Sequence, residues 1–255
     1  MTASGVAKRY SHRAPKVLEG VNGRLMAGTV TRLSGPNGAG KSTLLRILAG
    51  VSLPTRGRVE RAGAVGYAPD VGLAPGRLSA RGLLRHMARL RRLEGPAEAR
   101  IAELADVLGL TAWLDVPLAG ASLGTRRKAT LAQALLGAPP VLVLDEPWAA
   151  LDAPSRAGLG SLLDGVRSSG GCVVYSDHRE TGTALRPDAE WRLADGAVTV
   201  VAAPHAGTAA RVRVRVVAVG DGEEVAFEVA PDESDALLRS LLDRGMGIRR
   251  VERLP

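Results

Sequence analysis

The 255-residue sequence has one cysteine, few aromatic residues and no long uninterrupted apolar run. The single Cys172 excludes a framework of disulfides within the chain. Because Phe, Trp and Tyr together make up only 3% of the residues, we expect a core of Leu, Val and Ala. The longest apolar stretch, Leu131 to Leu144, is broken by Gln133, Gly137 and two prolines, which excludes a membrane span there.

Lysine is also scarce, with 4 lysines against 30 arginines, and the formal net charge is +8. Such a charge is typical of a protein with an anionic partner, such as a nucleotide, a nucleic acid or a lipid surface. It is equally typical of an arginine-rich proteome with a solvated basic surface. Since neither a signal peptide nor a membrane span is visible, we expect a cytoplasmic protein. The length predicts one full domain, or one domain plus a small appendage.

One segment carries a specific chemical signal, because residues 35–43 read GPNGAGKST and fit the pattern G-x-x-x-x-G-K-[ST]. An alternating strand, Thr29 to Leu33, precedes it, and a helix from Ser42 to Ala49 follows. Strand, glycine-rich turn and helix together predict a loop that wraps the phosphates of a nucleoside triphosphate. We expect Lys41 to reach the β- and γ-phosphates and the Ser42 hydroxyl to ligate Mg²⁺. The predicted nucleotide-binding residues of the loop are Gly35, Pro36, Asn37, Gly38, Ala39, Gly40, Lys41, Ser42 and Thr43.

A second segment, Val141 to Leu144, is an apolar strand that ends in two acids, Asp145 and Glu146. Ligands in parallel sheets bind at the carboxyl ends of the strands. We therefore expect Asp145 in the Mg²⁺ shell and Glu146 where it orients or deprotonates the attacking water. The alternative is a pair of acids that only end a strand.

Two further strands, Ala64 to Ala68 and Cys172 to Ser176, support an α/β nucleotide-binding fold. The second of them is followed by Asp177 and His178. A histidine at this end of the sheet is a candidate contact for the γ-phosphate, and the alternative is a solvated side chain.

In this order, the segments resemble an ABC transporter ATP-binding subunit over roughly residues 3 to 200. The resemblance implies an α/β P-loop NTPase with a mixed-sheet core, ATP and Mg²⁺ as ligands, and ATP hydrolysis by Lys41, Glu146 and His178. It also implies that two ATPase subunits face each other head to tail, so that the signature segment of one closes on the ATP of the other. Four further nucleotide-contacting residues follow from the resemblance: Tyr10 against the adenine, Ser122 and Gly124 in the signature segment, and Asp152 in the segment after the acids.

Two positions depart from the family pattern. Asp70 replaces the usual glutamine after the Tyr67 strand and remains a candidate Mg²⁺ ligand. The signature segment, usually LSGGQ, reads Ala121 to Thr125 as ASLGT, and Leu123 adds bulk where backbone should approach phosphate. We therefore expect ATP binding with impaired closure of the site.

The middle of the chain predicts a helical subdomain over about residues 78–125. One helix begins at Ser79 and runs to about Leu93, and a second runs from Pro96 to about Leu108. Arginines recur at helical spacing on the first, which indicates either a docking face for a membrane partner or lipid, or a solvated face. These arginines are Arg81, Arg85, Arg89 and Arg92.

We predict an ATPase domain over residues 1–203, a linker over 204–210 and a small α+β extension over 211–255. The extension is expected to hold strands at 211–216, 225–229 and 248–254 and a helix at 232–244. It resembles the C-terminal extension of ATPases from drug exporters of the ABC-2 type.

The predicted function is that of an ATPase subunit that powers a membrane exporter through a separate transmembrane permease, as a homodimer or heterodimer. It would be cytoplasmic and peripheral on the inner face of the membrane, with no nucleic acid as partner. Two alternatives stay open: a soluble ABC ATPase that acts on nucleic acid or ribosomes, and a degenerate regulatory ATP-binding subunit.

Overall fold

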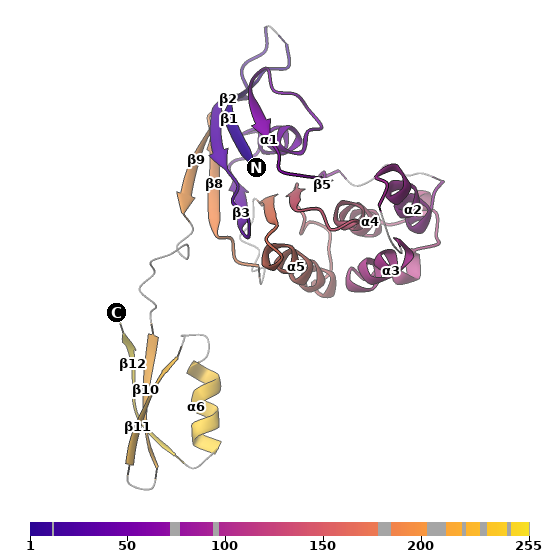
Figure 1. The fold of residues 1–255 in the computed structure, drawn as a ribbon. Coiled ribbons are helices and arrows are strands. Elements are labelled where there is room, and N and C mark those ends of the chain that lie inside the picture. Colours follow the sequence, from indigo (N-terminus) through magenta and orange to yellow (C-terminus); the bar gives the residue numbers. More distant parts are fainter. Residues whose placement is uncertain are drawn as a thin grey trace. The chain divides into compact units, whose positions relative to one another are not determined.

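The computed structural model describes residues 1–11, 13–71, 77–93, 97–177, 185–202, 213–220, 223–229, 234–243 and 246–254. The chain divides into two compact units, Met1–Ala203 and Pro204–Pro255 (Figure 1).

A six-stranded mixed sheet forms the centre of the first unit. Its strands, in spatial order, are β5 (Val65–Ala68), β6 (Val141–Leu144), β7 (Cys172–Ser176), β3 (Val30–Ser34), β8 (Ala189–Ala194) and β9 (Ala197–Ala202). The first five run parallel and β9 is antiparallel to β8. Strands β6 and β7 are buried along their whole length, which explains their continuous apolar sequences. The α/β fold with a mixed-sheet core that the sequence predicts is confirmed.

Both faces of this sheet are covered. On one face, Val141 and Val143 join a core with helix α1 (Lys41–Ala49) and a second, antiparallel sheet (Figure 1). That sheet has the order β2 (Leu18–Arg24), β1 (Thr2–Lys8), β4 (Arg56–Glu60). On the other face, Leu142 and Leu144 pack into a core that contains the remaining helices of the unit. Alternate residues of one strand therefore stabilise two different layers.

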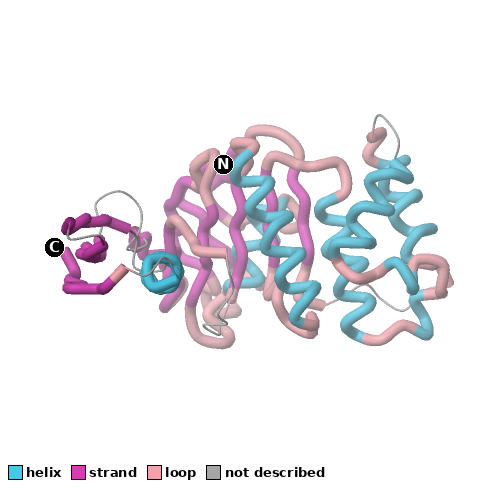
Figure 2. Tube along the Cα trace, turned by 90° about the horizontal axis from the view of Figure 1, so that it is seen from below, coloured by secondary structure: helices cyan, strands magenta, loops and turns pink. Residues whose placement is uncertain are grey.

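The predicted helical subdomain is a group of three helices beside the sheet, cyan in Figure 2. They are α2 (Ala80–Leu90), α3 (Ala97–Val107) and α4 (Leu123–Leu135). Short 3-10 turns lie at Thr111–Trp113 and Leu118–Gly120. A further helix, α5 (Ala153–Ser168), packs against β7. The Ser79 hydroxyl caps α2, as predicted, by accepting the Gly82 N–H at 3.1 Å. The predicted end at Leu93 is wrong, because α2 ends at Leu90 and Arg92 has a positive φ of 50°. Of the described helices, none has the length and apolarity needed to span a bilayer.

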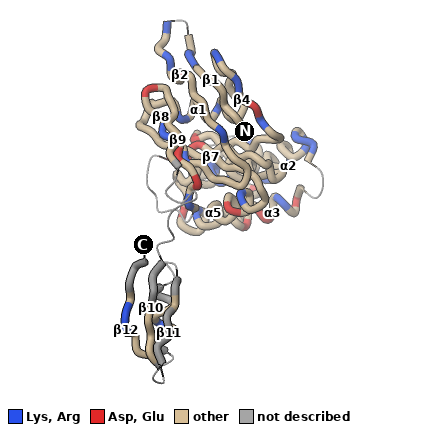
Figure 3. The backbone as a smooth tube through the Cα atoms, turned by 60° about the vertical axis from the view of Figure 1, so that its left-hand side comes forward, with Lys and Arg blue, Asp and Glu red and all other residues tan. Residues whose placement is uncertain are grey.

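Two of the arginines predicted on the face of α2, Arg81 and Arg85, pair with acids of the same subdomain; Figure 3 marks basic positions in blue and acidic positions in red along the backbone. Arg81 forms ion pairs with Asp115 at 2.7 Å and with Glu98 at 3.3 Å, and Arg85 pairs with the same Glu98. These guanidinium groups lower the pKa of Glu98. Arg92 lies beyond the end of α2. Half of the proposed docking face is thus neutralised by acids of the same subdomain.

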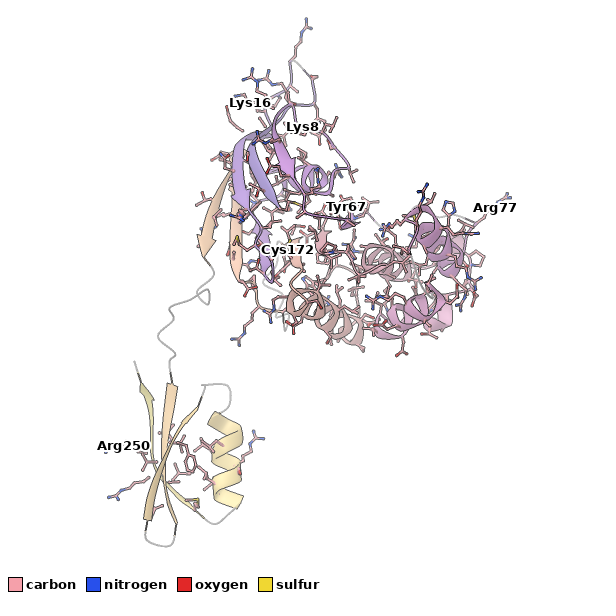
Figure 4. All side chains as sticks on the ribbon, in the orientation of Figure 1. Lys8, Lys16, Tyr67, Arg77, Cys172 and Arg250 are labelled. Atoms are coloured by element: carbon pink, nitrogen blue, oxygen red, sulfur yellow. The ribbon has the colours of Figure 1, made fainter. Side chains whose placement is uncertain are left out.

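The second unit consists of β10 (Arg213–Gly220), β11 (Glu223–Val229), α6 (Ser234–Asp243) and β12 (Gly247–Leu254). The three strands form an antiparallel sheet in the order β11-β10-β12. Val216, Ala218 and Leu241 form its buried core, while Arg250 is exposed on β12 (Figure 4). The chain from 203 to 212, which includes the predicted linker, lies outside the described residues.

Candidate functional site

The phosphate loop lies between β3 and α1, and its backbone requires glycine at two points. Gly35 has φ 148°, and a Cβ there would lie 2.3 Å from the Leu193 carbonyl oxygen. Gly40 has φ 102°, and its Cβ would lie 2.9 Å from Val17 Cγ1. Gly40 precedes α1, and no side chain caps this helix in the described part of the chain. The first N–H groups of α1 are therefore available to an anion, which the positive end of the helix dipole also attracts.

Lys41 and Tyr10 flank this loop. The Lys41 side chain is buried, and its Nζ donates hydrogen bonds to the carbonyl oxygens of Gly35 at 2.7 Å and Pro36 at 3.1 Å. The Tyr10 hydroxyl lies 3.0 Å from Thr43 Oγ1, while the residue is 61% exposed. Lys8, on β1, places its ammonium 5.3 Å from the centre of the Tyr10 ring. An exposed aromatic face at the edge of the loop can stack on a base.

The two acids follow β6 and are tied to β7 by a serine. Asp145 is 2% exposed, and its Oδ1 accepts a hydrogen bond from Ser176 Oγ at 2.7 Å. The same Oγ accepts the Glu146 N–H at 2.8 Å. Glu146 has φ 50°, in the left-handed region that costs a non-glycine residue about 1–2 kcal/mol. The sequence analysis missed Ser176, whose only signal was its place at the carboxyl end of a strand beside β6.

A second residue that the sequence analysis missed is Arg127 on α4. It is 2% exposed and donates hydrogen bonds to four backbone carbonyl oxygens. These belong to Pro69, Asp70, Asp145 and Glu146. Burial lowers the pKa of Arg127, and the nearby carboxylates of Asp70, Asp145 and Glu146 oppose that shift.

One pocket of about 340 Å³ brings the phosphate loop and the acids together. It is lined by Val17, Asn37, Gly38, Gly40, Lys41, Ser42, Thr43, Asp70, Asp145 and Glu146. All three predicted Mg²⁺ ligands therefore border the same space. Within the described ranges, no group of three or more His, Cys, Asp or Glu side chains is placed to hold a metal alone. Mg²⁺ fits this donor set, because it takes hard oxygen ligands and uses few protein groups together with substrate phosphates.

Neither the signature segment, Ala121 to Thr125, nor Asp152 lines this pocket. Ser122 caps α4, with its Oγ 3.1 Å from the Thr125 N–H and 2.9 Å from Thr125 Oγ1. Gly124 approaches Ala150, whose carbonyl oxygen would lie 2.9 Å from an added Cβ. Asp152 caps α5 through the Ser155 N–H and pairs with Lys128 at 2.7 Å, contacts that lower the pKa of its carboxyl.

The remaining predicted residue, His178, lies outside the described residues, so its contact with the γ-phosphate stays a prediction. Of the predicted loop residues, Gly35 and Pro36 contribute the carbonyl oxygens that Lys41 contacts, and Ala39 packs at the edge of the α1 core.

Comparisons with known proteins give one family. The family model described as ABC transporter matches residues 18–149. The cytochrome c biogenesis ATP-binding export protein CcmA of Hyphomonas neptunium is 36% identical over 182 residues, which cover 71% of this chain and 91% of that protein. The zinc import ATP-binding protein ZnuC of Halorhodospira halophila is 41% identical over 160 residues, or 62% of this chain and 60% of that protein.

Solved structures agree in fold. A structure of an ATP-binding subunit of an ABC transporter superposes with a TM-score of 0.74 at 24% identity and covers 80% of this chain and 90% of its own. A dimeric ATP-binding cassette bound to ADP and phosphate gives a TM-score of 0.70 at 22% identity, over 79% of this chain and 97% of its own.

Proposed function

This chain belongs to the ABC transporter family as an ATP-binding subunit, and we propose that it hydrolyses MgATP between two copies to drive a separate permease. The observation that carries the proposal is the pocket that joins Lys41 and Ser42 of the phosphate loop to Asp145 and Glu146. A cation, a hydroxyl and two acids around the open N-terminus of a helix are the groups that phosphoryl transfer needs.

The phosphate loop binds and orients the triphosphate. The free N–H groups at the start of α1 donate to phosphate oxygens, and Lys41 exchanges its loop carbonyls for the β- and γ-phosphates. Ser42, Asp145 and Asp70 would hold Mg²⁺, which would neutralise charge on the phosphate oxygens. Tyr10 stacks on the adenine.

Glu146 orients and deprotonates the attacking water, and Lys41 and His178 stabilise the charge that develops on the γ-phosphate. Ser176 supports this role, because it fixes the peptide between Asp145 and Glu146. As the family resemblance implies, Ser122, Gly124 and Asp152 would contact the nucleotide of a second copy.

The partner is a transmembrane permease, and the subunit works at the inner face of the membrane as a homodimer or heterodimer. The named relatives support this, as one is an ATP-binding export protein and another an ATP-binding import protein. We favour export because the sequence after residue 203 resembles the C-terminal extension of ABC-2 type exporters, and strands and a helix are present there. Nucleic acid is not part of the proposal.

A degenerate regulatory subunit is the second candidate. Leu123 favours it, because this residue is 58% exposed at the start of α4, where the family places a glycine. A bulky side chain there opposes the approach of a phosphate.

Steady-state ATP hydrolysis by Glu146→Gln and by the control Glu60→Gln tests the proposal. Glu60 is an exposed residue of β4 that pairs with Arg58. We expect Glu146→Gln to lose turnover by roughly 100-fold or more, to keep ATP binding and to elute as a dimer with ATP. Full turnover in Glu146→Gln contradicts the role of Glu146. No turnover in wild type, with the co-purified permease present, favours the regulatory candidate.

A further inference from the structure

The Arg127 side chain of α4 contacts two backbone segments that carry acids, Pro69–Asp70 and Asp145–Glu146, which we call the acid-bearing segments. We infer that Arg127 is a positioning residue that fixes the backbone of Asp70 and Glu146 to α4 and thereby sets where the Glu146 carboxylate lies. The inference rests on the proposed ATPase function, and it adds a residue to those of the phosphate loop, the acids and the signature segment that the proposed function uses.

The geometry of the guanidinium supports this role. Its Nη1 donates to the carbonyl oxygens of Pro69 and Asp70, the latter at 3.0 Å. Its Nη2 donates to those of Asp145 and Glu146, the latter at 2.6 Å. Each terminal nitrogen thus serves one segment, and the planar fork fixes the spacing between the two. A lysine ammonium is a single point and cannot hold both pairs in this arrangement.

The contact falls on a strained peptide. Glu146 has φ 50°, a conformation that persists only where its surroundings enforce it. Ser176 holds the amide side of this peptide, through the Glu146 N–H at 2.8 Å and Asp145 Oδ1 at 2.7 Å. Arg127 holds the carbonyl oxygens of the same two residues. Ser176 of β7 and Arg127 of α4 therefore fix the backbone from which the Glu146 carboxylate extends.

The position of Arg127 along α4 gives the contact a second consequence. Ser122 precedes the helix, five residues before Arg127, which is about 7.5 Å along the helix axis. In the proposed dimer, Ser122 meets the ATP of the second copy. The same rigid helix then touches one nucleotide with its N-terminus and holds the catalytic segments of the other site. A shift of α4 moves Asp70 and Glu146 together.

The test compares Arg127→Lys with Arg126→Lys, the same chemical change one position earlier on the same helix. Arg126 Nη1 donates instead to the Ala121 carbonyl oxygen at 2.6 Å. We expect Arg127→Lys to lower kcat by roughly 10- to 100-fold, because small misplacements of a catalytic group have effects of this size. Affinity for a non-hydrolysable ATP analogue should change by less than about threefold, since the phosphate loop is untouched.

The outcomes separate the two levels of inference. If wild type does not hydrolyse ATP, the proposed function fails; if wild type does and Arg127→Lys matches Arg126→Lys in kcat, the inference about Arg127 fails. A parallel loss of kcat and analogue affinity also overturns it, because that pattern marks general damage to the site. Should Arg127→Lys not fold, Arg127→Gln is measured in the same way, and failure of both to fold assigns Arg127 a structural role only.

Discussion

Two helix N-termini, those of α1 and α4, differ in how their first N–H groups are satisfied. Helix α1 follows Gly40, and no described side chain caps it. Helix α4 follows Ser122, whose hydroxyl accepts the Thr125 N–H and contacts the Thr125 hydroxyl. Without a cap, all of the first N–H groups need an external acceptor, whereas the Ser122 cap satisfies one of them. The phosphate loop therefore offers more unpaired N–H groups to a ligand than the start of α4 does.

This difference assigns separate tasks to the two segments. The free N–H groups of α1 bind phosphate without any rearrangement of the helix. A serine cap is worth about 1 kcal/mol, so Ser122 helps to stabilise the start of α4 before any phosphate approaches. We therefore expect binding and hydrolysis of the nucleotide to depend most strongly on α1, and turnover to depend less strongly on the start of α4.

The largest effect is expected at α1. Lys41→Ala removes the ammonium that now contacts Gly35 and Pro36 and should lower turnover by roughly 100- to 1,000-fold, because a preorganised cation at the γ-phosphate is lost. Steady-state hydrolysis measures the turnover, and calorimetry measures the affinity for ATP. Lys16→Ala, which removes an exposed lysine outside the site, is the matched control. If Lys41→Ala hydrolyses ATP within tenfold of the wild-type rate, the role assigned to the start of α1 is contradicted.

A smaller effect, of opposite sign, is expected at α4. Leu123→Gly removes an exposed side chain from the first turn and should raise turnover by up to about tenfold, or about 1.4 kcal/mol in the barrier. The measurement is steady-state hydrolysis with the permease present. The turnover of Leu123→Ala should lie between that of wild type and that of Leu123→Gly. Flat or reduced turnover in Leu123→Gly shows that bulk at this position does not limit closure.

The smallest effect concerns stability. Lys128 of α4 pairs with Asp152 at 2.7 Å, and this contact lowers the pKa of the Asp152 carboxyl. Asp152→Asn keeps the cap of α5 and loses only the ion pair, so we expect a loss of less than about 1 kcal/mol at neutral pH. Because the folded pKa is depressed, this difference is present above about pH 4 and shrinks as the pH falls below that value. Urea unfolding at several pH values measures it; a difference that grows in acid contradicts the assignment.

The sequence predicted the parts of the fold that repeat a local pattern. Strands β6 and β7 and helix α1 were recognisable because apolar runs and a glycine-rich turn mark them directly. The pocket that joins the phosphate loop to Asp145 and Glu146 follows from the rule that parallel strands end at one edge.

What the sequence did not predict depends on contacts between distant segments. Arg127 was one basic residue among three in a row, and only the packing of α4 against β5 directs it to four carbonyls. Ser176 was the end of a strand, and its hydrogen bonds depend on the register of β7 beside β6. The acids that pair with Arg81 and Arg85 come from α3 and the chain after it, so helical spacing alone did not reveal these ion pairs.

The most direct measurement mixes two inactive variants and records ATP hydrolysis. Lys41→Ala disables the phosphate loop, and Ser122→Asp keeps a good cap on α4 but turns a carboxylate toward phosphate. If each site joins the loop of one copy to the signature segment of another, a mixed dimer holds one intact site. Equimolar mixing should then restore about a quarter of wild-type turnover, from random pairing into a two-fold dimer. Turnover that stays at the mean of the two separate variants would show that the site is not shared.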